Sequence, residues 1–184
     1  MINNPTFEGD LDKLYYVKES SEGKVYHKSH DVFDQTPAFQ YPCRRGHTDA
    51  VKLLLADGRA DPTSLDNAIR LSCEHGYTDV VKLLLADGRA DPTEDDNWAI
   101  RLSSSRGHAE VVKLLLGEGS VDPTANDNYA IRWSSENGRK GVVQLLLADG
   151  RADPTADNNW AIRRSRENGH YNVVELLLAD ERAA

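Results

Sequence analysis

Cysteine is scarce in this 184-residue chain, which contains only Cys43 and Cys73. Two cysteines cannot form the disulfide framework of a small secreted domain. Long apolar runs are also absent, because the longest follow the pattern Val-Val-Lys-Leu-Leu-Leu-Ala, far short of the roughly 20 residues that cross a membrane. The first ten residues carry neither the basic nor the apolar segment of a secretory signal. We therefore expect no membrane association and a cytoplasmic or other reducing intracellular compartment.

Basic residues are in deficit as well. Lys and Arg total 22 and Asp and Glu total 30, so the formal net charge is 22 − 30 = −8. Nucleic acids attract basic surfaces, so the acidic net charge disfavours a nucleic-acid partner. The hydrophobic fraction of 39% is that of an ordinary globular protein.

Catalytic and metal-binding motifs are missing too. The chain has no phosphate-binding glycine loop, no nucleophile elbow and no zinc-protease motif. His27 and His30 lie close together, but no cysteine or carboxylate completes a metal-ligand set around them. We therefore expect a protein that is not an enzyme and that needs no metal or cofactor.

What the sequence does contain is a repeat. The segment Ala-Asp-Gly-Arg-Ala-Asp-Pro-Thr occurs three times, at 56–63, 86–93 and 148–155, and 117–124 is a variant of it. Glycines mark the period at Gly46, Gly76, Gly107, Gly138 and Gly169, with spacings of 30, 31, 31 and 31. A short fixed period of this kind indicates stacked structural units.

Each repeat predicts two short helices, shown here by the third. Residues 98–106 form the first, with Asn97 as its N-cap and Gly107 as the glycine that ends it. Residues 109–116 form the second, whose valines and leucines share one wide apolar face. Helices of about nine residues are unstable alone, so each must pack on the next copy. The expected fold is an all-α solenoid.

The repeats resemble the ankyrin repeat. The resemblance lies in Gly-His, then Val-Val-x-Leu-Leu-Leu, then Gly and Ala-Asp-Pro, and the motif recurs in register five times. It divides the chain into a degenerate N-terminal half-repeat and connecting loop at 1–35, and five repeats at 36–184, of which the last is a polar C-terminal cap. The resemblance implies stacked helix–turn–helix units and a non-catalytic role in binding another protein.

This chain departs from the family pattern in two ways. Trp/Tyr-Ala-Ile-Arg replaces the family's Thr-Pro-Leu-His, and the period is 31 rather than 33. We therefore expect short or reduced β-hairpin loops between the repeats. The longer connection over residues 20–35 is either a capping loop, which loop statistics favour, or a binding insertion.

Two columns of residues recur at fixed repeat positions. The arginine column is Arg70, Arg101, Arg132 and Arg163, and the aromatic column is Trp98, Tyr129 and Trp160. Regular recurrence favours a framework role for both. We expect the arginines to bridge to loop carbonyls or to the column of Asp61, Asp91, Asp122 and Asp153, and the aromatics to fill space between repeats. An anion-binding groove along the arginines is the alternative.

Positions that vary between repeats are better candidates for partner contacts. In the ankyrin family the end of the first helix faces the concave binding surface, flanked by the inter-repeat loops. The candidate residues are Arg44, Arg45, Glu74, His75, Asp95, Arg106, Asp127, Trp133, Glu136, Asn137, Glu167 and Asn168. This mixed-charge strip with an acidic rim suits a basic or amphipathic segment of another protein, and a solvated face without a partner fits equally well.

Two further functions stay open at this point. A structural spacer within a larger protein is one, and a binder of phosphate or nucleic acid through the arginine column is the other. We expect a monomer that presents a preformed surface. The sequence does not identify the partner.

Overall fold

A computed structural model describes residues 36–63 and 68–183, and all regular structure within these ranges is helical. The first helices of the repeats are α1 (Thr36–Arg45), α3 (Ala68–His75), α5 (Glu94–Arg106), α7 (Ala125–Glu136) and α9 (Ala156–Glu167). The second helices are α2 (Thr48–Asp57), α4 (Thr78–Asp87), α6 (Ala109–Gly117), α8 (Lys140–Asp149) and α10 (Tyr171–Leu178), followed by the 3-10 turn η2 (Glu181–Ala183). The half-repeat and loop expected at 1–35 lie outside the described residues.

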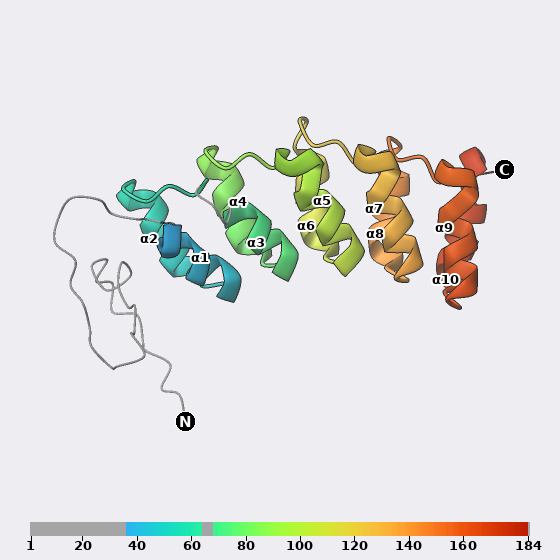
Figure 1. The fold of residues 1–184 in the computed structure, drawn as a ribbon, viewed down its shortest axis with the longest axis horizontal. Helices are drawn as coiled ribbons and strands as arrows, with labels where there is room; N and C mark the ends of the chain where they lie inside the picture. Colours follow the sequence, from blue (N-terminus) through green and yellow to red (C-terminus); the bar gives the residue numbers. More distant parts are fainter. Residues whose placement is uncertain (1–35, 64–67, 184) are drawn as a thin grey trace, which may run out of the picture.

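The helix pairs stand side by side in one row, each pair next to its neighbours in sequence (Figure 1). We call the first helices the first-helix layer and the second helices the second-helix layer. Neighbouring first helices make more contacts with each other than neighbouring second helices do. The first-helix layer therefore lies on the inner side of the curved row. This arrangement confirms the predicted all-α solenoid, and no strand occurs within 36–63 or 68–183.

The core runs between the two layers. Each second helix contributes a pair of adjacent small apolar residues and a leucine, as Val80, Val81 and Leu84 do in α4, and all three are completely buried. The first helices contribute buried apolar side chains from the other layer, Ile69 in α3 and its equivalents. The buried side chains fall into two clusters, and α6 contributes to both. No helix in the described part of the chain is long and apolar enough to cross a membrane.

The glycine at the end of α1, α3, α5 and α7 is required by both conformation and space. Gly76 has φ +75°, in the left-handed region. A Cβ placed there would lie 2.5 Å from Nδ1 of His108 in the next repeat. Tyr77, Arg139 and His170 cover the equivalent glycines of the other repeats. The repeats therefore interlock at this end, with a side chain of each lying over a bare backbone in the one before.

The N-terminal parts of α5, α7 and α9 each contain a left-handed turn. In α5 the turn consists of Asp95, Asp96 and Asn97, all with φ between 50° and 57°. The same left-handed triplet occurs at 126–128 and 157–159. Only Asn and Asp among residues with a side chain adopt this conformation readily, which explains the composition of the turns.

The predicted N-cap role of Asn97 is wrong. Its backbone is left-handed, and its Oδ1 accepts a hydrogen bond from the backbone N–H of Asp122 in the next repeat, at 2.8 Å. Asn128 binds Asp153 in the same way at 2.7 Å. These asparagines connect repeats instead of capping their own helices.

The loops that follow the second helices hold a second connection. Arg151 binds Asp149 through Nε, and its Nη1 and Nη2 donate to the carbonyl oxygens of Val121 and Leu116 in the preceding repeat. This hydrogen bond from Arg151 lowers the pKa of Asp149 below its ordinary range. Arg89 and Arg182 make the equivalent contacts, and we call the three residues the loop arginines.

The two cysteines are free and buried, as expected. Burial raises the pKa of the Cys43 thiol to about 12 and raises that of Cys73 as well. Ser104 and Ser135 occupy the same position in the next two repeats, and their buried Oγ atoms have no hydrogen-bond partner within the described residues. The first four repeats thus carry a small buried side chain at this position, and at Ser104 and Ser135 the hydroxyl finds no partner within the described residues.

Candidate partner-binding surface

The arginine column lies along the N-terminal half of the first helices. Arg101 donates from Nε to the carbonyl oxygen of Asp96 and from Nη2 to that of Asp95, in its own left-handed turn. Arg132 and Arg163 donate from Nη2 to the carbonyl oxygens of Asn126 and Asp157, whereas the buried Nε of Arg132 has no hydrogen-bond partner within the described residues. The expected bridge to loop carbonyls is therefore confirmed.

The aspartate partner expected for this column is wrong. Arg70 binds Asp95 at 3.1 Å and Arg132 binds Asp157 at 3.0 Å, and both carboxylates come from the left-handed turn of the next repeat. The aspartates of the Asp-Pro column instead accept from the threonine two residues later, as Asp122 does from the backbone N–H and the hydroxyl of Thr124. The sequence shows both aspartate columns, but not which of them faces the arginines.

The arginine and aromatic columns form one structure. The guanidinium of Arg70 lies 4.7 Å from the ring centroid of Trp98, and Arg101 and Arg132 lie 5.3 and 5.4 Å from those of Tyr129 and Trp160. Each arginine thus stacks on the aromatic residue of the following repeat, a favourable cation–π arrangement. Sequence reasoning treated the two columns separately and missed this contact.

Trp133 joins the aromatic column into a cluster. Its ring centroid lies 5.4 Å from that of Tyr129 on the same helix and 5.5 Å from that of Trp160 on α9. All three rings are half-buried. We call Tyr129, Trp133 and Trp160 the aromatic cluster. It gives the first-helix layer a partly exposed apolar area next to guanidinium groups, the combination that is enriched in binding hot spots.

Several candidate residues at the C-terminal ends of the first helices bind each other. Arg106 forms an ion pair with Glu74 of the preceding repeat at 3.0 Å. Arg164, which was not a candidate, binds Glu136 of the preceding repeat and Glu167 of its own helix, each at 2.7 Å. These carboxylates and guanidiniums therefore connect repeats, which limits how freely a partner can recruit them.

The remaining candidates differ in how much of their bonding capacity is used. Asn137 and Asn168 donate from Nδ2 to the carbonyl oxygens of Ser105 and Glu136, one repeat earlier. The other exposed candidates are Arg44, Arg45, His75, Asp95 and Asp127. The ends of the helices and the left-handed turns lie at opposite ends of the first helices, separated by about 12 Å of helix in α5. The candidate strip therefore covers the full length of the first-helix layer.

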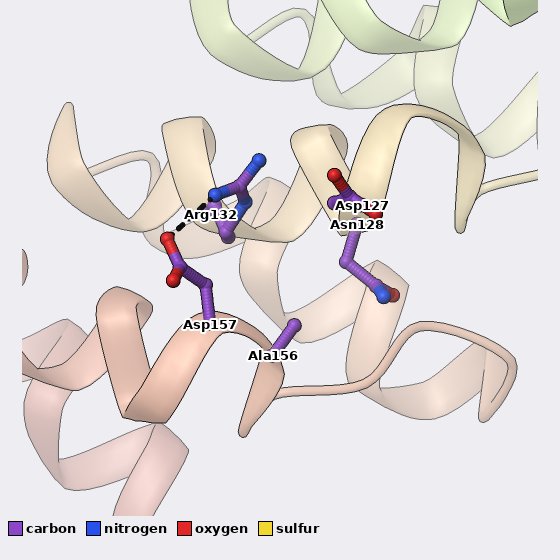
Figure 2. Close-up of a pocket in the computed structure, with 5 residues that line it drawn as sticks. All are labelled: Asp127, Asn128, Arg132, Ala156 and Asp157. Atoms are coloured by element: carbon purple, nitrogen blue, oxygen red, sulfur yellow. Dashed lines mark hydrogen bonds and ion pairs between the residues drawn. The ribbon is translucent and has the colours of Figure 1, made fainter.

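A polar hollow of about 390 Å³ lies between α7 and α9 (Figure 2). Its lining consists of Asp127, Asn128, Arg132, Ala156 and Asp157. Arg132 points across it to Asp157, and the carboxylate of Asp127 makes no hydrogen bond or ion pair within the described residues. Small-molecule pockets are mostly apolar and enclosed by aromatic side chains, and this hollow has neither property. Residues 36–63 and 68–183 also contain no cluster of metal-ligating side chains.

The comparison with known families agrees with the geometry. A model of ankyrin repeats, built from three copies, matches residues 8–96 and again 97–184. A search of curated proteins finds no match. Two matches in tandem cover nearly the whole chain, and the helix pairs, glycine turns and stacked first helices are those of an ankyrin array. The chain belongs to the ankyrin-repeat family.

Proposed function

We propose that this chain is a non-catalytic protein-interaction module whose first-helix layer forms the binding surface. The family is generally one of protein-interaction modules. The observation that supports this layer in particular is the half-buried aromatic cluster, which lies among arginines on the inner side of the row. Aromatic and arginine side chains supply most of the binding energy at protein interfaces.

Preorganisation is the proposed mechanism. Covered glycines join each pair of neighbouring repeats, and the loop arginines and the bridging asparagines add further bonds at some of these junctions. The partner then meets a surface that is already ordered, so association loses little conformational entropy of the module. Three or four repeats offer enough area for a standard interface of about 800 Å² per partner.

Ion pairing in the arginine column speaks against phosphate or nucleic acid as the ligand. Arg70 and Arg132 are each neutralised by an aspartate of the next repeat. The column therefore does not present a continuous row of free guanidiniums, which binding to a phosphate backbone would require.

Capture from a cell lysate, read by mass spectrometry, tests the proposal. The wild-type chain is compared with a first-helix variant that carries Trp133→Leu, Arg45→Ser and Arg166→Ser. Leucine stands at the Trp133 position in two other repeats, and neither arginine makes a hydrogen bond or ion pair within the described residues, so the fold is expected to survive. The matched control carries Lys52→Ser and Lys113→Ser in the second-helix layer.

The proposal requires a protein that wild type and control retain and the first-helix variant loses, with all three chains showing the same circular dichroism. If all three capture the same proteins, the first-helix layer is not the binding surface. In that case the result favours a structural spacer, in which the repeats separate other parts of a larger assembly.

A further inference from the structure

The left-handed turns differ at one position that faces the arginine column. Asp95 and Asp157 place a carboxylate on the arginine of the preceding repeat, 25 residues earlier in each case. The equivalent residue between them is Asn126. Its backbone has the same left-handed conformation, with φ 54° against 50° and 54° in the aspartates. One of the three carboxylate positions is therefore filled by a neutral amide.

Arg101 stands 25 residues before Asn126, the spacing that joins Arg70 to Asp95 and Arg132 to Asp157. It uses Nε and Nη2 for carbonyl oxygens of its own turn and stacks on Tyr129, as its equivalents do on their aromatic residues. Its Nη1 makes no hydrogen bond within the described residues, whereas Nη1 of Arg70 and of Arg132 each bind an aspartate. A guanidinium held in a fixed orientation with a free N–H edge is well suited to bind a carboxylate.

Cationic side chains are segregated between the two layers. The first helices contain nine arginines and no lysine, and the second helices contain four lysines and no arginine. Most carboxylates of the first helices are already held by ion pairs within the array, namely those of Glu74, Asp95, Glu136, Asp157 and Glu167. The free hydrogen-bonding capacity of the first-helix layer is thus weighted toward guanidinium groups, opposite to the basic partner that the sequence suggested.

We propose that Arg101 binds an Asp or Glu side chain of a partner protein, at the place that Asp95 and Asp157 fill in the neighbouring repeats. This inference rests on the proposed function, because it identifies the partner of the same surface. Asp96 and Asp127, the second residues of the adjacent turns, would repel a long acidic run. The matching segment therefore carries a single acidic residue, flanked by apolar residues that reach the aromatic cluster.

The neighbouring repeats suggest a substitution that should block the binding site at Arg101. Asn126→Asp introduces the residue that already stands at this position in two other repeats, so the backbone is preserved. Its carboxylate is expected to bind Nη1 of Arg101, to leave thermal stability equal or higher, and to exclude the partner's carboxylate. Asp157→Asn is the matched control, because it changes the same position in the next repeat, frees Arg132 and leaves Arg101 untouched.

Selection from a phage-displayed library of random twelve-residue peptides provides the probe. Wild type is expected to enrich peptides that share one acidic residue beside apolar residues. Fluorescence anisotropy of an enriched peptide, labelled with a dye, then gives its affinity for each chain. Asn126→Asp is expected to weaken binding about tenfold or more, as is Glu→Gln in the peptide, whereas Asp157→Asn does not weaken it.

Three results would overturn the inference: no enriched peptide, enriched peptides without a shared acidic residue, or an acidic peptide that binds Asn126→Asp as tightly as wild type. The lysate capture reports separately on the proposed function. A captured protein that is lost by the first-helix variant but kept by Asn126→Asp would leave the interaction module standing and remove only the role of Arg101.

Discussion

Arg151 donates from Nη1 to the carbonyl oxygen of Val121, 2.8 Å away and one repeat earlier in the chain. The same side chain is anchored from behind by Asp149 and reaches the carbonyl oxygen of Leu116 as well. Arg151 thus donates to backbone carbonyl groups at and just after the end of α6, in the preceding repeat. The loop arginines therefore connect neighbouring repeats without occupying a position in the hydrophobic core.

Arg151→Ala should lower the free energy of unfolding by about 1–2 kcal/mol, because it leaves two carbonyl groups and Asp149 without their charged donor. Urea denaturation followed by circular dichroism measures the change. Arg163→Ala is the control, since this exposed arginine makes one longer bond of 3.3 Å and should change stability by less than about 0.5 kcal/mol. Equal losses in both variants would show that the contacts of Arg151 contribute nothing specific.

The third repeat tests the same contact in the opposite direction. Ser120 stands where the loop arginines stand, and Gly117 and Glu118 replace the Ala-Asp of the other loops. Replacing residues 117–120 by Ala-Asp-Gly-Arg should place the new arginine on the carbonyl oxygens of Leu85 and Ala90 and raise stability by about 1 kcal/mol. The loop Ala-Asp-Gly-Ser is the control, and a gain of the same size with it would assign the effect to the helix end instead.

Two glycines separate the cost of backbone strain from the cost of crowding. Gly76 and Gly88 have φ +75° and +77°, but only Gly76 has neighbours, the ring of His108, where a Cβ would stand. Gly88→Ala should therefore cost about 1 kcal/mol, and Gly76→Ala about 2–4 kcal/mol because the ring must move. Thermal unfolding of the two variants compares them directly. The interlocking of repeats at Gly76 would be disproved if the two melted together.

The position shared by Cys43, Cys73, Ser104 and Ser135 predicts a stabilising substitution. Ser104 and Ser135 are completely buried, and their hydroxyl groups have no partner within the described residues. A cysteine at either position, as in Cys73, removes this unsatisfied group and should raise stability by about 1 kcal/mol. Ser103→Cys is the control, because Oγ of Ser103 donates to the carbonyl oxygen of Ala99 and its loss should destabilise. Chemical denaturation of the three variants would reject the prediction if all of them lost stability.

The buried thiols predict a loss of stability in alkali. The pKa of Cys43 is raised from 9.0 to about 12 in the folded chain, so the unfolded chain loses this proton first as pH rises. The contribution is complete below pH 9 and is lost between about pH 9 and 12, with a slope of up to about 1.4 kcal/mol per pH unit for each thiol. Denaturation of wild type and of Cys43→Ala/Cys73→Ala at pH 8 and 10 measures it. Wild type should lose more of its free energy of unfolding than the variant between pH 8 and pH 10. An equal loss in both chains would contradict the buried state of the thiols.

The sequence predicts the solenoid because the signals of its units repeat. Apolar residues at helical spacing, a glycine at each helix end and a proline before each new unit are local features, and each one appears several times. The contacts between units are harder to predict. Arg106 and Glu74, or Arg164 and Glu136, look like unrelated variation at positions 32 and 28 residues apart. Only the stacking of first helices reveals that they are pairs.

The left-handed turns were beyond local rules for a different reason. Asn and Asp are known to enter the left-handed region as single residues, and nothing in the pattern Asp-Asp-Asn distinguishes three such residues in a row from a helix cap. The turn places the side chain of Asn97 against the next repeat and the carboxylate of Asp95 against Arg70 of the preceding one. The predicted loop residues were therefore correctly located on the surface, but their contacts were not predictable.

The constant spacing of the bonds between repeats also has a consequence for how such a gene changes. Asn97 binds Asp122 and Asn128 binds Asp153 across the same 25 residues. Duplicating or removing one whole 31-residue unit restores every such pair with new members, whereas an insertion of another length separates them. The gain or loss of a whole repeat can therefore lengthen or shorten the array without new contacts having to arise. A single substitution such as Asn126 can then distinguish one copy from the others.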